Sequence, residues 1–117
     1  MIVYHEALPK SYLLVLASDS TGSSERELAH YLGEARRSGK PAVWVDCRLL
    51  DTLSAVGARL LWASHLRLHR RGVQLVLCRV SQGLKQALRQ VKSTPSPALC
   101  LVPTLDDAAA QTGGLAW

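Results

Sequence analysis

The stretch from Ala42 to Leu77 constrains the fold more than any other part of the sequence. It begins with the apolar run A-V-W-V-D-C and ends with a second apolar run, G-V-Q-L-V-L, and a helical pattern lies between them. Short apolar runs bounded by turn signals are typical of strands that are buried on both faces. Two such strands joined by a helix favour parallel pairing with a right-handed crossover. The stretch therefore predicts one β-α-β unit of an α/β fold, in which a turn from Asp51 to Gly57 precedes the helix.

The rest of the chain extends this unit into a single domain. The apolar run Tyr12 to Ala17 predicts another buried strand, and Met1 to Ala7 predicts an edge strand that pairs with it in the antiparallel direction. The other predicted elements are helices at about Glu25–Arg37, Ser54–Gly72, Ser81–Lys92 and Thr104–Gln111, and strands at Val73–Cys78 and Ala98–Val102. We therefore expect one α/β domain over residues 1–117, with a mixed β-sheet of about five strands and about four helices packed on it. Residues 1–11 hold the edge strand and its turn, and residues 112–117 form a tail.

Local signals mark several helix ends. Ser24 followed by Glu27 fits a capping box, and Thr104 stands before two acidic residues in the first turn of the last helix. Gly39 and the proline after it end the first helix, and Gly72 ends the long one. These signals fix where elements begin and end, and they carry no chemistry of their own.

Charge and cysteine content limit the classes of function. The net charge of +5 permits weak attraction to anions, but no clear pattern interleaves basic with aromatic residues, so we expect no nucleic-acid partner. Three widely spaced cysteines, Cys47, Cys78 and Cys100, predict reduced and buried thiols. No signal-peptide pattern is present, and no apolar run is long enough to cross a membrane. We therefore expect a cytoplasmic protein without a transmembrane segment.

No catalytic, metal or cofactor site emerges from the motifs. The glycine-containing stretches at Thr21 and Thr112 lack the Lys of a phosphate loop. His65 and His69 share a helix face, but the Glu and the third ligand of a zinc peptidase are missing, so we interpret them as part of a solvated basic face. No His or Asn is tied by the sequence to Cys47 as its base. We expect a protein that is not an enzyme and that binds no cofactor.

Other polar residues near the turn allow more than one interpretation. Asp46 and Asp51 either pair as carboxylates or, in the interpretation that we prefer, stabilise the strand end and the turn separately. Ser54 lacks the G-x-S-x-G context of a hydrolase nucleophile.

A helical wheel of the long helix gives it two apolar sides. One side holds Gly57, Leu60, Leu61, Ser64 and Leu68, and the other holds Ala55, Ala58, Trp62 and Leu66, with Arg59, His65 and His69 around them. Trp62 is then either an exposed anchor for a partner or part of a second buried stripe, packed by a neighbouring helix.

Four blocks of the sequence, in this order, resemble the STAS domain family, whose fold is that of bacterial anti-sigma factor antagonists. A-V-W-V-D-C resembles the family's strand that ends in Asp or Asn, and L-S-A-V-G-A-R-L-L resembles the turn and helix start usually written D-S-S-G-L-G-x-L-L. R-R-G-V-Q-L-V-L-C resembles the following strand, and V-P-T-L-D-D-A resembles the closing strand and helix. The order and spacing hold from about Tyr12 to Gln111, so the resemblance implies a STAS-like fold.

The family's best-known switch falls on a residue that cannot carry it. In the family, the second Ser of D-S-S-G is often phosphorylated by a partner kinase that also acts as an anti-sigma factor. An ungapped alignment through Gly57 and Gly72 places Val56 at this position. A rival alignment places Ser54 there as the phosphoacceptor, but it needs an insertion in the helix. With the ungapped alignment, which we prefer, the resemblance implies an interaction module without phosphorylation at the usual position.

The resemblance implies a non-enzymatic protein-protein interaction module for transcription regulation in a bacterial signalling system. Its partner would be a kinase-like anti-sigma factor or a STAS-containing signalling complex. The predicted binding surface consists of Asp51, Ser54, Ala55, Val56, Gly57, Ala58, Arg59 and Trp62. The alternative is a STAS-like accessory subunit of an ABC-type phospholipid transport system, docked on an ATPase subunit. A nucleotide or anion binder and a small enzyme are less favoured hypotheses, and a homodimer is left open.

Overall fold

The computed structural model describes residues 1–18, 25–92 and 97–111. Within these residues, strands and helices follow one another in the predicted order. The predicted loop around Thr21, the predicted cap at Ser24 and the tail from Thr112 lie outside the described residues.

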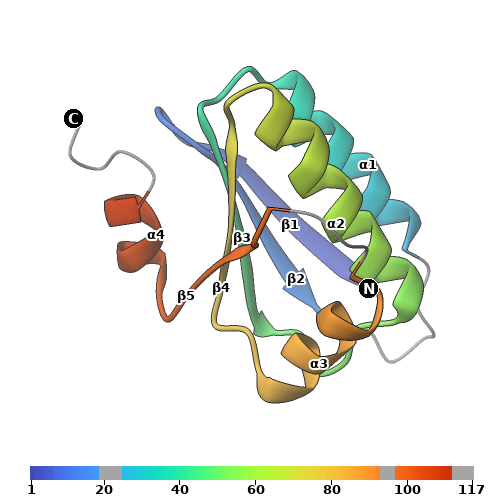
Figure 1. Ribbon diagram of the computed structural model, residues 1–117. Coiled ribbons are helices and arrows are strands. Elements are labelled where there is room, and N and C mark those ends of the chain that lie inside the picture. Colours follow the sequence, from blue (N-terminus) through green and yellow to red (C-terminus); the bar gives the residue numbers. More distant parts are fainter. Residues whose placement is uncertain (19–24, 93–96, 112–117) are drawn as a thin grey trace.

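A five-stranded mixed sheet forms the centre of the domain (Figure 1). Strand β1 (Ile2–Ala7) pairs antiparallel with β2 (Tyr12–Ala17), as predicted. Strands β3 (Ala42–Leu49), β4 (Gln74–Cys78) and β5 (Cys100–Val102) follow, each parallel to the strand before it. The spatial order of the strands is therefore their order in the sequence, with β1 and β5 at the two edges.

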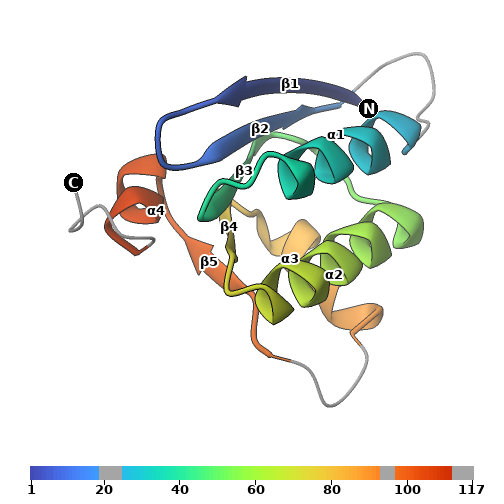
Figure 2. The same cartoon turned by 90° about the horizontal axis from the view of Figure 1, so that it is seen from above.

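The helices cover the two faces of the sheet unequally. Helices α1 (Arg26–Arg37), α2 (Ala55–Arg70) and α3 (Gln82–Gln90) lie on one face, and α4 (Leu105–Gln111) lies on the other (Figures 1 and 2). Among the helices of the described ranges, none combines the length and the apolar character that crossing a bilayer requires.

Two strand boundaries differ by two residues from the prediction because pairing sets them. Strand β3 runs on to Leu49, since a register shift in β2 lets Ala17 pair with Leu49. Strand β5 begins at Cys100, later than the predicted Ala98, because its ladder with β4 starts only at that residue. Hydrophobic patterning carries no information about either ladder, so it could not give these ends.

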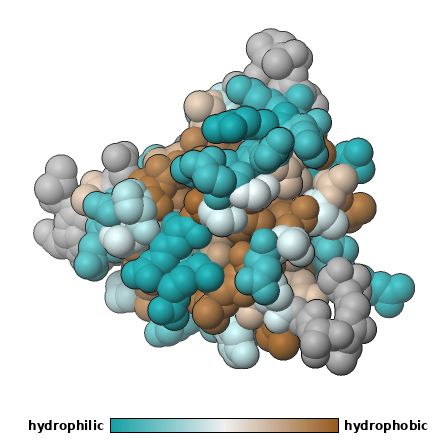
Figure 3. Space-filling model, turned by 90° about the horizontal axis from the view of Figure 1, so that it is seen from below, coloured by the Kyte–Doolittle hydropathy of each residue, from teal (hydrophilic) through white to brown (hydrophobic). Residues whose placement is uncertain are grey.

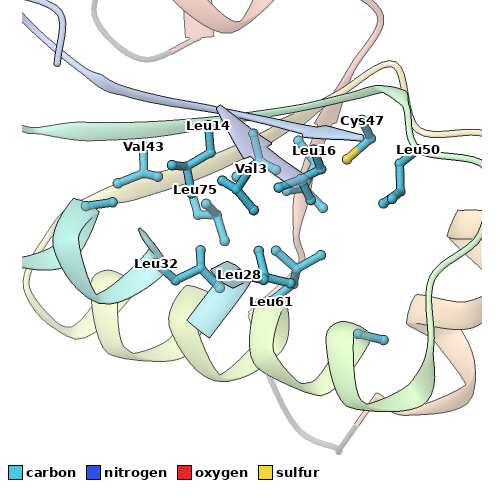
Figure 4. Packing of buried hydrophobic residues seen from close by; sticks show 14 of the residues in the cluster. Val3, Leu14, Leu16, Leu28, Leu32, Val43, Cys47, Leu50, Leu61 and Leu75 are labelled. Carbon is cyan, nitrogen blue, oxygen red and sulfur yellow. The ribbon is translucent and has the colours of Figure 1, made fainter. Parts of the chain in front are cut away.

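The larger hydrophobic core fills the space between the sheet and the three helices. Because side chains alternate along a strand, every second residue of the inner strands points into this layer. Leu14, Val43 and Leu75 of the sheet meet Leu28 and Leu61 of the helices there (Figure 4). All five are at most 1% exposed. This core holds α2 in a fixed position on the sheet, and it thereby determines which α2 side chains reach the surface.

A smaller core lies on the other face of the sheet, under α4. Trp44, Val76 and Val102 come from three neighbouring strands, and Ala108 of α4 closes the layer. The Thr104 hydroxyl accepts a hydrogen bond from the Asp107 amide at 3.2 Å, which confirms the predicted cap of this helix.

The buried stripe of α2 differs from the predicted one. It consists of Gly57, Ala58, Leu61, His65 and Leu68. Ala58, which was predicted as part of the partner-binding surface, is therefore buried in the core, and the interpretation of His65 as part of a solvated basic face was wrong. His65 is buried because the segment before β5 covers it, and its Nε2–H donates to the Pro97 carbonyl oxygen at 3.1 Å.

Leu61→Ala tests the main core. Removing a fully buried Leu side chain should lower the free energy of unfolding by about 2–5 kcal/mol, because a cavity remains. Val56→Ala on the same helix is the control, since Val56 is 53% exposed and its loss should change stability by about 0.5 kcal/mol or less. Urea unfolding measures both. Equal effects would contradict the described orientation of α2.

His65 should make stability depend on pH. Burial lowers the pKa of His65 from its ordinary value of 6.5; the hydrogen bond to Pro97 opposes this shift, and His69 adds to it. The folded state then resists protonation, so stability is full above pH 6.5 and falls as the pH drops toward the lowered folded-state pKa.

Unfolding experiments at about pH 7.5 and about pH 5 can isolate this effect. His65→Gln should lose less stability between these two conditions than the unsubstituted protein. His69→Gln, at an exposed position, should keep most of the original dependence, because His69 is the smallest of the three causes of the shift. If His65→Gln changed as steeply as the unsubstituted protein, His65 would not be the source.

Candidate functional site

The candidate site lies where the chain leaves β3 and enters α2, at the carboxyl ends of the parallel strands. Figure 3 views this end of the molecule, where apolar side chains form a band between clusters of hydrophilic ones. Leu50 turns inward and is 5% exposed, and Leu53 packs partly against the same core. These two anchors hold the connection down, so that the residues between and after them face outward.

Ser54 begins α2 as its N-cap, as predicted. Its Oγ accepts a hydrogen bond from the Gly57 amide at 3.0 Å, which satisfies one of the free amides at the helix start. The same hydroxyl donates to Glu25 Oε1 at 3.0 Å, just before α1. Ser54 therefore ties the starts of two helices together, a role that its capping position alone does not reveal.

Gly57 sits in the tightest part of this connection. A Cβ atom at this position would lie 2.8 Å from Leu53 Cδ1, so any larger residue requires the Leu53 side chain to move. Gly57 is buried and contributes no contact surface of its own. The lack of a side chain at Gly57 lets the first turn of α2 pack closely against Leu53 in the connection before the helix.

Asp51 is held through its backbone. The Asp51 amide donates to Ser18 Oγ at 2.8 Å, and the Ser18 amide donates to the Leu49 carbonyl oxygen at 3.1 Å. Asp46, in contrast, is buried, and its Oδ1 accepts from the Arg48 amide at 3.0 Å. The Asp46 carboxylate thus has a local contact at the strand end, as the preferred interpretation expected, whereas the role of the Asp51 carboxylate stays a prediction.

Exposure divides the residues of the predicted binding surface. Gly57 and Ala58 are buried and cannot reach a partner. The exposed residues here, which we name the α2 amino-terminal surface, are Asp51, Thr52, Ser54, Ala55, Val56 and Arg59. Val56 is the large apolar member, and 53% of its surface is exposed. A branched apolar side chain in this position loses contact with water only when something else covers it.

Trp62 is not an exposed anchor. It is half-buried between α2 and α3, and its Nε1–H donates to the Leu88 carbonyl oxygen at 2.8 Å. The Lys92 ammonium lies 5.9 Å from the centre of its ring. The structure thus supports the second of the two predicted alternatives, because α3 packs against this side of α2.

A hollow of about 230 Å³ adjoins the start of α2. It is lined by Met1, Ser18, Glu25, Leu50, Thr52, Leu53 and Ser54. Its described lining includes the Glu25 carboxylate and no Lys or Arg side chain, so the side chains described there supply no positive charge for a phosphate. The negative charge of Glu25 beside Ser54 therefore offsets the positive amino-terminal end of α2, which would otherwise favour a bound anion.

Among the described residues near this site, no cysteine thiol is a good nucleophile. Burial raises the pKa of Cys47 to about 12, and Asp46 and Cys78 add to the shift, so the reactive thiolate is disfavoured. All three cysteines are free, and Cys47 and Cys78 are buried as predicted, whereas Cys100 is only partly buried, contrary to the prediction. The described residues contain no group of three or more His, Cys, Asp or Glu side chains arranged to hold a metal ion.

Sequence reasoning missed Glu25 as part of this site. Glu25 contacts Ser54 across 29 positions of the chain, and it was seen only as an acidic residue at a helix start. No spacing rule connects the two, because the contact depends on how α1 and α2 dock side by side.

Comparison with known proteins agrees with the fold described above. The model of the STAS domain matches residues 9–108. No curated protein matches the sequence. Among solved structures, a variant of RsbS from Moorella thermoacetica has a TM-score of 0.80 at 12% identity, with 97% of each chain covered.

Two further structures are similar over nearly the whole chain. An anti-sigma factor antagonist from Mycobacterium paratuberculosis has a TM-score of 0.78 at 17% identity, with 95% of this chain and 92% of that chain covered. A chain of the stressosome, described as a signal integration and transduction hub, has a TM-score of 0.74 at 11% identity, with 97% and 98% covered. At these identities the likeness concerns the fold.

Replacing Ser54 and Ser81, the two capping serines, separates the stability contributed by an ordinary cap from that contributed by the additional contact with Glu25. Ser81 caps α3 through the Leu84 amide at 3.2 Å and so matches Ser54 in its capping role. Ser81→Ala should cost about 1 kcal/mol, and Ser54→Ala about 1–2 kcal/mol, since it also loses the bond to Glu25. Chemical denaturation measures both. A smaller loss for Ser54→Ala than for Ser81→Ala would show that Glu25 contributes nothing.

Proposed function

This chain belongs to the STAS domain family, and we propose that it is a non-enzymatic module that binds a protein partner in a bacterial signalling system. Exposed Val56 on the α2 amino-terminal surface is the observation that carries the proposal. Its neighbours Asp51, Ser54 and Arg59 supply a polar rim. An apolar centre with a polar rim is the usual composition of a protein-protein contact.

The proposed partner is a kinase-like anti-sigma factor or a STAS-containing signalling complex in the cytoplasm. Support comes from the family and from the similarity of the fold to an anti-sigma factor antagonist and to a stressosome chain. The partner would lie over the first turn of α2, where the turn and the cap fix the backbone before binding. A surface that is already ordered loses little conformational entropy when it binds.

We further propose that this module works without phosphorylation at the family's usual position. Val56 has no hydroxyl. Ser54, the alternative acceptor, has its hydroxyl 3.0 Å from the Glu25 carboxylate. A phosphate on Ser54 would add a charge of about −1.5 to −2 beside that carboxylate, which would push the two helix starts apart. Control of binding would then come from the abundance or state of the partner.

Val56→Asp tests the proposed surface. The variant should weaken binding to the cognate anti-sigma factor or signalling-complex subunit by at least about tenfold, because a charge replaces the apolar centre. Ala63→Asp is the matched control, since Ala63 is exposed on the same helix and outside the surface. Calorimetric titration of purified pairs gives the affinities. The assignment would be contradicted if both variants weakened partner binding equally, or if neither variant weakened it.

Binding to an ATPase subunit of a phospholipid transport system, with no binding to either signalling partner, would instead favour the alternative function. The same set of variants would then show whether the α2 amino-terminal surface is used there as well.

Incubation with ATP and the candidate partner kinase tests the proposed absence of phosphorylation. The intact mass of the protein should stay unchanged, because neither Val56 nor the engaged Ser54 accepts phosphate. A mass increase of one phosphate that disappears in Ser54→Ala would overturn the ungapped alignment and make Ser54 the phosphoacceptor.

A further inference from the structure

A second groove lies between α3 and β5, at the free edge of the sheet. It encloses about 160 Å³, and its lining includes Lys85, Leu88, Arg89, Lys92, Leu99 and Leu101. We name it the β5–α3 groove. It shares no lining residue with the α2 amino-terminal surface, so it needs an explanation of its own.

Strand β5 leaves an unpaired edge in the described part of the chain. It pairs with β4 on one side, and the sheet order places no strand on its other side. Alternation sends Val102 into the small core under α4, while Leu101 points to the helix side and is 40% exposed. An edge strand with unpaired backbone groups and an exposed apolar side chain is a template on which another strand can add.

The surroundings of Leu101 are strongly basic. Lys85, Arg89 and Lys92 line the groove, and Arg79 with Lys85 lines an adjoining hollow that also reaches Leu101. No carboxylate lines either space among the described residues, and α3 contains no Asp or Glu. Within the described ranges, Lys85, Arg89 and Lys92 form no ion pair. The positive charge around Leu101 therefore has no counter-charge from the groove itself.

We propose that the β5–α3 groove binds an extended acidic peptide of a protein partner, which adds to β5 as a further strand. Alternate side chains of such a peptide would face the helix side. Apolar ones would cover Leu101, and Asp or Glu would meet Lys85, Arg89 and Lys92. The backbone pairing supplies affinity, and the charges select acidic over basic sequences.

The groove suits a peptide better than a nucleic acid. Single-stranded nucleic acid is held by aromatic rings on which bases stack. The aromatic residue in the groove lining is Trp62, and its ring is already engaged between α2 and α3 with Lys92 beside it. A purely electrostatic contact with phosphate groups would neither cover Leu101 nor pair with the open edge of β5.

A random octapeptide library displayed on phage tests the proposal with the full-length protein. Selected peptides should carry Asp or Glu together with apolar residues at alternate positions. The double variant Lys85→Glu/Arg89→Glu should bind them at least about tenfold more weakly, and Leu101→Ser should weaken them as well. Arg67→Glu/Arg70→Glu is the matched control, with the same change of net charge at two exposed positions of α2, and it should bind as before.

Thermal melting confirms that each variant folds before its affinity is compared. Selection of no acidic peptide, or of peptides that bind both double variants equally, would overturn the proposal. The proposal would also be overturned if no peptide were selected and the protein instead bound single-stranded DNA or anionic phosphatidylglycerol vesicles, provided that the Lys85→Glu/Arg89→Glu variant lost this binding. Partner binding that depends on Val56 should persist in this double variant, so failure here leaves the function proposed for the α2 amino-terminal surface untouched.

Discussion

The packing of α2 on the sheet is the contact on which the rest of the structure depends. Leu61 and Leu68 lie in the main core at 1% and 2% exposure, and they fix the rotation of the helix about its axis. That rotation sends Val56 outward and His65 inward. The Ser54 cap and the inward-turned Leu50 set where the helix begins. A binding surface at the start of α2 is thus a consequence of the core beneath it.

The two proposed surfaces differ in the physics of recognition. The α2 amino-terminal surface has an apolar centre on an ordered helix start, so affinity there would come from burying Val56. The β5–α3 groove combines an open strand edge with clustered cations, so binding there would weaken as salt increases. One small domain could therefore hold two partners, or two parts of one partner, without competition between them.

The sequence was sufficient for the order of the elements, because buried strands and capped helices leave local patterns. Apolar runs located β2, β3 and β4, and Ser54 and Gly72 marked the two ends of α2. The surroundings of Trp62 and His65 could not be predicted, since they depend on where α3 and the segment before β5 lie against α2. The Glu25–Ser54 bond was missed for the same reason. Periodicity shows that a helix has an apolar side, but its neighbours decide how many of its sides are covered.

The central claim is that the α2 amino-terminal surface contacts the partner. Hydrogen exchange measured by mass spectrometry, on the free protein and on its complex with the identified partner, tests this most directly. Our account predicts slower exchange in the complex for peptides that cover residues 51–59, with little change at the far end of α2. Unchanged exchange over residues 51–59, together with protection confined to another part of the chain, would contradict it.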